Sequence, residues 1–352
     1  MNDVSPTHQI TDRAIKAIGG DNPNADYILR PEEHARLLPP EAAPLARILL
    51  RHKQIQEEFR MHDALANKAQ ARYKFVGRWI LISSLIGLLL GATFLLPPLQ
   101  NAPPPLRTAA TIIEYLSLFA AFFLARYLAV ARPFPQWMRE RARAELARVK
   151  LFDVVLDSEE QVRDEELPLL PLKLEYFRRY QLDVQRRYYG RRGKQHQQAA
   201  GHTKTWERAS LTLSVISILI ALWVGLVLFP YFGVTLPWPP LQSVVNFAVA
   251  LPFDDERWLF ALGVAGAAFY GYATSRSLMN LDERNASRYL TTHANLEFIV
   301  EKILEPARQH AARGDEADVR EFVRRVQDLI SSEHKEWVDL QETLGGRLAL
   351  GS

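Results

Sequence analysis

The chain of 352 residues contains no cysteine. Disulfides, thiolate metal sites and cysteine nucleophiles are therefore excluded, and this composition suits a reducing compartment. Enzyme motifs are missing as well: the sequence has no glycine-rich phosphate loop followed by lysine, no HExxH and no GxSxG. The nine histidines are scattered without metal-ligand spacing, and we expect His202, His293 and His334 to be solvated helix residues. We therefore expect a protein that is not an enzyme and needs no cofactor or metal.

The first 75 residues lack an apolar run that resembles a signal peptide. Further along the chain there are four apolar stretches separated by polar segments. The longest, 209–229, reads ASLTLSVISILIALWVGLVLF and contains neither charge nor proline. At about 1.5 Å per residue, a helix of this length crosses a hydrocarbon core of roughly 30 Å. Together with 79–96, 108–131 and 258–274, this stretch predicts four membrane spans.

The distribution of Arg and Lys predicts how these spans are oriented. A basic segment precedes 209–229, whereas the loop 230–256 carries no Lys or Arg. Cationic flanks stay in the cytoplasm, so we expect both termini there. Because short proline-containing turns join antiparallel neighbours, the spans should pair as hairpins. The predicted fold is an all-α membrane protein with four transmembrane helices in two parallel-repeat hairpins and long cytosolic helical extensions.

A weak internal repeat supports this organisation, because Lys74, Arg78 and Ser84 recur as Lys204, Arg208 and Ser214. The expected segments are 1–44, an N-terminal cytosolic regulatory segment; 45–167, the first hairpin with its flanking helices; 168–308, a basic helix, the second hairpin and a helix; and 309–352, a C-terminal cytosolic helix. Within 1–44 we expect a short helix near 10–18 and otherwise loop, and within 45–75 a helix that enters the first span unbroken. The segment 316–344 is predicted to be an amphipathic helix with apolar residues at helical spacing, namely Val319, Phe322, Val323, Val326 and Ile330.

Polar and small residues inside the spans are candidate functional residues. Glu114 and Arg126 lie about 18 Å apart along the second span, so they cannot pair within it. A charged group at membrane depth usually faces a pore or a partner, and snorkelling to the interface is the alternative for both residues. We hypothesise that Glu114 lines or abuts an aqueous path. Small residues at every fourth position predict close helix packing, at Gly87, Gly91, Gly263, Ala267 and Gly271.

The segment 173–208 is strongly basic, with ten Lys and Arg against three acidic residues. Guanidinium groups bind phosphates and tyrosine rings stack on bases, a combination found in single-strand-binding surfaces. The residues that could bind a phosphate or an oligonucleotide are Arg178, Arg179, Arg186, Arg187, Tyr188, Tyr189, Arg191, Arg192 and Lys194. Two alternatives stay open. One is the ordinary positive-inside bias with contact to anionic lipid, and the other is pairing with the acidic segment 153–166.

The segment that follows the first predicted hairpin carries a short motif. PQWMRERARAELARVKLF resembles the W-x-x-x-R-x-x-A-E-x-L signature of SLATT-type membrane effectors through Trp137, Arg141, Ala144 and Glu145, which are followed by Leu146 and Phe152. The tail SSEHKEWVDL is similar to the C-terminal end of that family through Glu333 and Trp337. A duplicated, four-span version resembles the channel effector of Hailong-like antiphage systems. The second repeat keeps Glu283, Arg284 and Leu290 but lacks the tryptophan and the Ala-Glu pair.

The resemblance implies a pore-forming effector encoded beside a nucleotidyltransferase whose nucleotide product controls it. Four helices leave little room for a channel, so we expect a homo-oligomer around an axis, with a tetramer favoured. The expected function is an ion channel of antiphage defence in the bacterial inner membrane, in contact with membrane lipid. A nucleotide or short single-stranded oligonucleotide would gate it on the cytosolic side, causing depolarisation and growth arrest. The alternatives are a non-conducting membrane scaffold or sensor that recruits a cytosolic partner, and a transporter.

Overall fold

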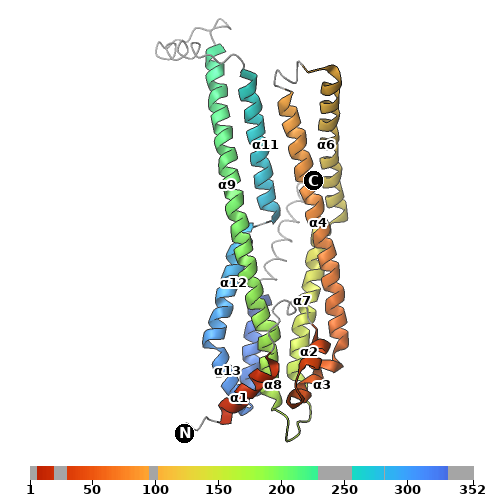
Figure 1. The fold of residues 1–352 in the computed structure, drawn as a ribbon, viewed down its shortest axis with the longest axis vertical. Helices are drawn as coiled ribbons and strands as arrows, with labels where there is room; N and C mark the ends of the chain where they lie inside the picture. Colours follow the sequence, from red (N-terminus) through yellow and green to blue (C-terminus); the bar gives the residue numbers. More distant parts are fainter. Residues whose placement is uncertain (1–5, 20–29, 95–101, 229–255, 281, 332–352) are drawn as a thin grey trace, which may run out of the picture. The chain divides into compact units, whose positions relative to one another are not determined.

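The computed structural model describes residues 6–19, 30–94, 102–228, 256–280 and 282–331. Every secondary-structure element within these ranges is a helix, which confirms the all-α prediction. The chain divides into two compact units, each drawn from separate parts of the sequence (Figure 1). Unit 1 comprises Met1–Arg72, Pro133–His196 and Arg284–Ser352, and unit 2 comprises Tyr73–Arg132 and Gln197–Glu283. These units differ from the consecutive segments expected from the sequence.

Most helices belong to unit 1. They are α1 (Pro6–Ile18), α2 (Pro31–Leu37), η1 (Pro40–Ala42), α3 (Ala43–Arg51), the first part of α4 (Lys53–Thr93), α7 (Pro133–Asp157), α8 (Leu169–Phe177), the π-helix η2 (Arg178–Leu182), the start of α9 (Asp183–Leu228), most of α12 (Asp282–Lys302), α13 (Leu304–Arg313) and a helix over 316–331. Unit 2 contains the remainder of α4 and α9, together with α6 (Pro104–Ala131) and α11 (Glu256–Asn280).

The N-terminal segment is more helical than its composition suggests. The helix expected near 10–18 is confirmed as α1, which packs against α8 and α13 and buries Ala14 and Ile18. Residues 31–42 were expected to be loop, and that prediction is wrong because they form α2 and η1. Pro31 and Pro40 each occupy a first helical position, where proline's fixed φ favours a helix and its missing N–H is not needed.

The helix expected to be unbroken over 45–75 is interrupted at His52, where φ is −104° and ψ is 38°. No glycine or proline causes this break. The buried face of α3, with Leu45 and Ile48 both 0% exposed, belongs to the same core cluster as Phe59 of α4. Burial of the apolar faces of α3 and α4 in one core therefore outweighs the tendency of the residues around His52 to continue the helix. After this break, α4 continues without interruption to Thr93.

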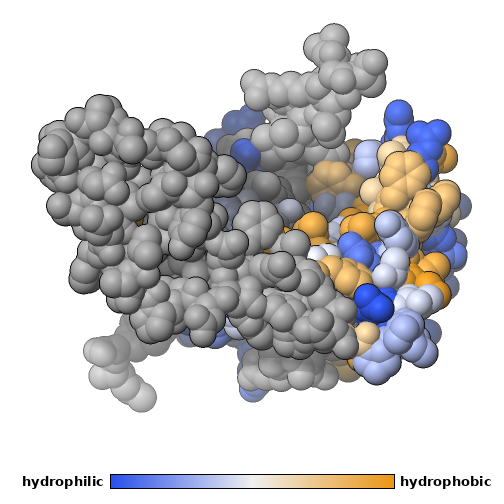
Figure 2. Space-filling model, turned by 90° about the horizontal axis from the view of Figure 1, so that it is seen from above, coloured by the Kyte–Doolittle hydropathy of each residue, from blue (hydrophilic) through white to orange (hydrophobic). Residues whose placement is uncertain are grey.

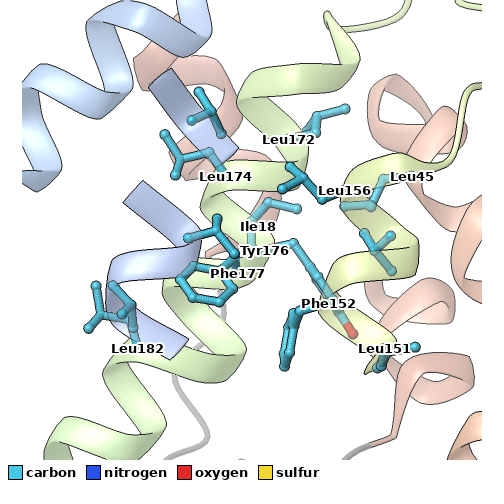
Figure 3. Packing of buried hydrophobic residues seen from close by; sticks show 14 of the residues in the cluster. Ile18, Leu45, Leu151, Phe152, Leu156, Leu172, Leu174, Tyr176, Phe177 and Leu182 are labelled. Atoms are coloured by element: carbon cyan, nitrogen blue, oxygen red, sulfur yellow. The ribbon is translucent and has the colours of Figure 1, made fainter. Parts of the chain in front are cut away.

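One hydrophobic cluster holds unit 1 together (Figure 3). At its centre, the rings of Phe152 on α7 and Phe177 on α8 lie 5.4 Å apart, and Phe177 also contacts Phe322, with 6.3 Å between ring centroids. Each large side chain buried in this way contributes about 1.5–3 kcal/mol. The amphipathic prediction is confirmed over 316–331, since all five of its apolar residues are buried; residues 332–344 lie outside the described ranges.

In unit 2, α4 and α6 lie side by side and antiparallel (Figure 1). Among the described residues, two stretches are long and apolar enough to cross a membrane, Lys53–Thr93 and Pro104–Asp157. They contain the predicted spans 79–96 and 108–131, apart from residue 94, which follows the end of α4, and residues 95 and 96, which lie outside the described ranges. Only 6% of the apolar window in the second stretch is buried, so this helix is not the covered core helix of a globular domain.

The third and fourth predicted spans lie within α9 and α11. Residues 209–228 and 258–274 are helical, whereas residues 229–255 and many side chains of both helices lie outside the described part of the chain. The four-span arrangement therefore stays a prediction.

The connection from α6 to α7 is a single residue. Arg132 has φ 44° and ψ 49°, the left-handed conformation, and Pro133 begins the next helix. Proline disfavours the α conformation in the residue before it, so the helix must stop here. The left-handed geometry of a non-glycine residue costs about 1 kcal/mol.

Candidate functional site

Glu114 lies where two glycines of α4 face α6. A Cβ at Gly87 would lie 2.6 Å from Leu118 Cδ2, and a Cβ at Gly91 would lie 3.0 Å from Glu114 Oε1. The two glycines of α4 therefore face α6, and the missing side chain of Gly91 leaves the space that the carboxylate occupies. Glu114 has no ion pair or hydrogen bond with any other described residue. An apolar helix that carries an unpaired carboxylate needs water, a cation or another chain at that position.

The same contacts fix the height of Arg126. Gly87 lies opposite Leu118, and Gly91 lies opposite Glu114. The helices are antiparallel, so a step toward the start of α4 corresponds to a step toward the end of α6. Trp79 is eight residues before Gly87 and Arg126 is eight residues after Leu118, so these two residues lie at the same height. Both side chains are exposed. Tryptophan and arginine at one height are typical of a membrane interface, which favours the snorkelling alternative for Arg126. Glu114 lies about 18 Å further along α6, a distance that is shorter than the roughly 30 Å thickness of a hydrocarbon layer.

The small residues of α11 are arranged differently from those of α4. Gly263 is half-buried, Ala267 and Gly271 are exposed, and no described side chain lies within 4 Å of a Cβ built at Gly271. Close packing is therefore found at Gly87 and Gly91, whereas the described part of this chain brings no neighbour to Gly271.

In unit 1, the arginines at the start of the basic segment are engaged within the fold. Arg178 pairs with Glu175 and Asp183, each at 2.6 Å, and Arg186 pairs with Glu297 at 3.2 Å. Arg179 is only 6% exposed. The acidic segment 153–166 finds other partners, because Arg47 binds both Glu160 and Glu166, and Arg320 binds Asp157.

The tyrosines of the basic segment also belong to the core of unit 1. Tyr189 is 4% exposed, and its ring lies 5.6 Å from that of Tyr289 on α12. Tyr188 is half-buried against the same cluster, with the Arg192 guanidinium 5.8 Å from its ring centroid. Stacking of a base on Tyr189 is incompatible with this burial. The exposed remainder of the predicted ligand surface is Arg191, Arg192 and Lys194, with Arg187 half-exposed beside them.

Two residues of the SLATT-like motif form an ionic cluster that could not be located from local sequence patterns. Arg141 on α7 pairs with Glu145 at 2.7 Å and with Asp63 on α4 at 2.9 Å. The nearby Glu145 carboxylate raises the pKa of Arg141, so this guanidinium stays charged. One residue earlier on each helix, His62 and Glu140 lie 2.6 Å apart. These pairs fix the register of α7 against α4.

A second buried group, which sequence analysis missed, is His34 on α2. Its Nδ1 lies 3.0 Å from the Tyr176 hydroxyl, and its ring stacks on Tyr180 with centroids 3.7 Å apart. Burial lowers the pKa of His34 to about 4, so the ring is neutral at physiological pH. No local signal marks this residue, because its partners lie far along the chain.

Three side chains in the described part of unit 1, His310, Asp315 and Asp318, bring their ligand atoms within 4.8 Å of one another. Arg313 already pairs with Asp315 at 3.2 Å and contacts His310 Nδ1 at 3.1 Å. The cluster is therefore a set of ion pairs at the end of α13, and we assign no metal to it.

Models of known protein families, curated proteins and solved structures contain no match for this chain. In the part of the chain that the structure describes, the protein is all-helical and has two helices able to cross a membrane. Its relation to SLATT-type effectors stays a prediction.

Proposed function

We propose that this protein is a homo-oligomeric pore-forming membrane effector, an ion channel in the bacterial inner membrane with both termini in the cytoplasm. The observation that carries the proposal is the carboxylate of Glu114. It lies in an exposed apolar helix against Gly91, and no described residue pairs with it. Rings of acidic side chains build cation pathways when several subunits surround one axis. The antiphage role, with depolarisation and growth arrest, rests on the family resemblance.

The gating ligand in this proposal is a nucleotide or short single-stranded oligonucleotide, made by a nucleotidyltransferase encoded nearby, that binds the exposed residues of α9. Arg191 and Lys194 are exposed on neighbouring turns of α9. Lys194 precedes residue 209 by about 22 Å of helix, more than twice the Debye length of about 8 Å at physiological salt. This distance supports a soluble anion, rather than lipid headgroups at the start of the predicted span, as the partner of these charges.

A non-conducting scaffold is the second candidate. It is favoured by the burial of Tyr189 and Arg179, which removes a stacking ring and a cation from the ligand surface. Planar-bilayer recording of the purified full-length chain, with and without oligonucleotide, separates the two functions. A channel gives current in at least one ligand state, whereas a complete lack of current in every state would favour the scaffold.

A binding experiment tests the ligand surface. The double variant Arg191→Gln/Lys194→Gln removes two exposed charges of α9, and Lys68→Gln/Arg72→Gln on α4 is its charge-matched control. If both charges contact phosphates, the slope of log affinity against log salt should fall by about 1.4 in the first variant only. Unchanged oligonucleotide affinity in that variant would remove the site.

A further inference from the structure

One face of α6 combines a cation with a long apolar column. Arg126 stands at one end, and Phe122, Phe119, Tyr115 and Ile112 follow at alternating steps of four and three residues, the spacing of a single helix face. The four apolar side chains are between 51% and 65% exposed. From Arg126 to Ile112 the column is about 21 Å long. Figure 2 shows hydrophobic side chains at the surface of the coloured part of the molecule, interspersed with hydrophilic ones.

The charged end of this column lies at the height where a membrane interface is expected. Arg126 is level with the exposed Trp79, and Arg78 lies one residue before Trp79 on α4. Neither arginine has a hydrogen bond or ion pair with another residue in the described part of the chain. The two cations therefore have unused capacity to bind anions, beside an indole of the kind that marks lipid interfaces.

The chemistry of this surface selects its ligand. Arg126 carries a positive charge, so a second copy of this surface would repel the first. A small anion would leave the apolar column uncovered, and a neutral lipid would leave the guanidinium group unpaired. An amphiphile with an anionic head and a long hydrocarbon tail satisfies both parts, because guanidinium binds phosphate in bidentate fashion and each buried methylene contributes about 0.8 kcal/mol.

We propose that α6 carries a binding site for one anionic phospholipid, with the phosphate on Arg126 and an acyl chain along Phe122, Phe119 and Tyr115. Arg78 is nine residues from Gly87, which faces α6, so it lies on the opposite face of α4 and outside this site. This inference goes beyond the proposed channel function. It requires only that α6 lies in a membrane, so a protein that conducts nothing would still bind the lipid.

The test uses the full-length chain purified in mild detergent. Phosphatidylglycerol, phosphatidylcholine and inorganic phosphate are added separately, and bound lipid is counted by native mass spectrometry while thermal unfolding is followed in parallel. We expect phosphatidylglycerol alone to bind and to raise the unfolding temperature. Arg126→Gln should weaken this binding about fivefold, and Arg126→Lys less, because lysine keeps the charge but not the bidentate geometry. Phe119→Ala should weaken it with the headgroup contact intact.

The matched control is Arg107→Gln. Arg107 is exposed near the other end of α6, and its guanidinium also lacks a partner among the residues described, so its loss should leave phosphatidylglycerol affinity unchanged. Three outcomes would overturn the proposal: equal affinity in Arg126→Gln and the parent chain, equal loss in Arg107→Gln, or equal stabilisation by inorganic phosphate. A disulfide between two chains carrying Phe119→Cys, in a protein with no other cysteine, would show that a second copy covers the column instead.

Discussion

Acidification should release α2 from unit 1, because His34 is neutral in the fold. The ring is 7% exposed, stacks on Tyr180 and lies within hydrogen-bond distance of the Tyr176 hydroxyl. The nearby cations Arg179 and Arg30 oppose protonation, and only Glu33 favours it. A protonated imidazole at this position would be a buried charge without a close anionic partner.

The size of the effect follows from the pKa values. Burial lowers the pKa of His34 from 6.5 to about 4. Between these values the unfolded segment binds a proton that the folded segment does not, so stability is complete above pH 6.5 and falls as the pH drops toward 4. At pH 5 the loss is about 2 kcal/mol, and it approaches about 3 kcal/mol below pH 4. Glu33 stays ionised at pH 5, since its hydrogen bond with Arg30 lowers its pKa.

Hydrogen–deuterium exchange of the α2 amides measures this change directly. Once corrected for the intrinsic pH dependence of exchange, α2 should exchange about 30-fold faster at pH 5 than at pH 7, the equivalent of about 2 kcal/mol. The control is His34→Gln, whose amide can still bond to the Tyr176 hydroxyl but does not titrate. Equal protection of the parent chain at both pH values, or an equal loss in His34→Gln, would refute the reasoning.

Two further substitutions test the packing of each unit. Glu175→Gln removes a buried charge, 1% exposed, that pairs with both Arg178 and Arg308, and it should lower the free energy of unfolding by about 3 kcal/mol in thermal or urea denaturation. Gly87→Ala places a Cβ 2.6 Å from Leu118 Cδ2, so the unfolding temperature of the solubilised protein should fall, corresponding to about 1–3 kcal/mol of overpacking.

Each substitution has a control in the same unit. Glu305 also pairs with Arg308, but its side chain is 50% exposed, so Glu305→Gln should cost less than about 1 kcal/mol. Gly271→Ala adds a methyl group where no described atom lies within 4 Å, so it should be tolerated. If Glu175→Gln and Glu305→Gln lowered the free energy of unfolding equally, burial of Glu175 would not be the cause of its effect. If Gly87→Ala and Gly271→Ala had equal effects, the close approach of Leu118 to Gly87 would not be the cause.

The sequence predicted those features that depend on local pattern. Periodic apolar residues located the helix over 316–331, and long apolar runs located the two helices able to cross a membrane. The break at His52 and the helices within 31–42 were missed, because burial of α3 and the placement of two prolines determine them. Tertiary packing overrides local propensity at such points.

The candidate site was predicted only in part. Glu114 and Gly91 were both singled out, but their contact required the register of α4 against α6. The burial of Tyr189 and Arg179 could not be predicted from the alternation of Arg and Tyr in the sequence. Successive residues of a helix point in different directions, so some of these side chains face the core and others face solvent. Charge type is visible in a sequence, whereas the partner of each charge depends on which helices meet.

The central claim is that Glu114 lines an ion pathway through an assembly of these chains. Reversal potentials measured in planar bilayers across a salt gradient test it most directly, with the parent protein and Glu114→Gln compared under the same ligand conditions. A ring of carboxylates favours cations, so the parent should show a cation-selective reversal potential that moves toward zero in Glu114→Gln. Identical conductance and reversal potential in the two proteins would contradict the account.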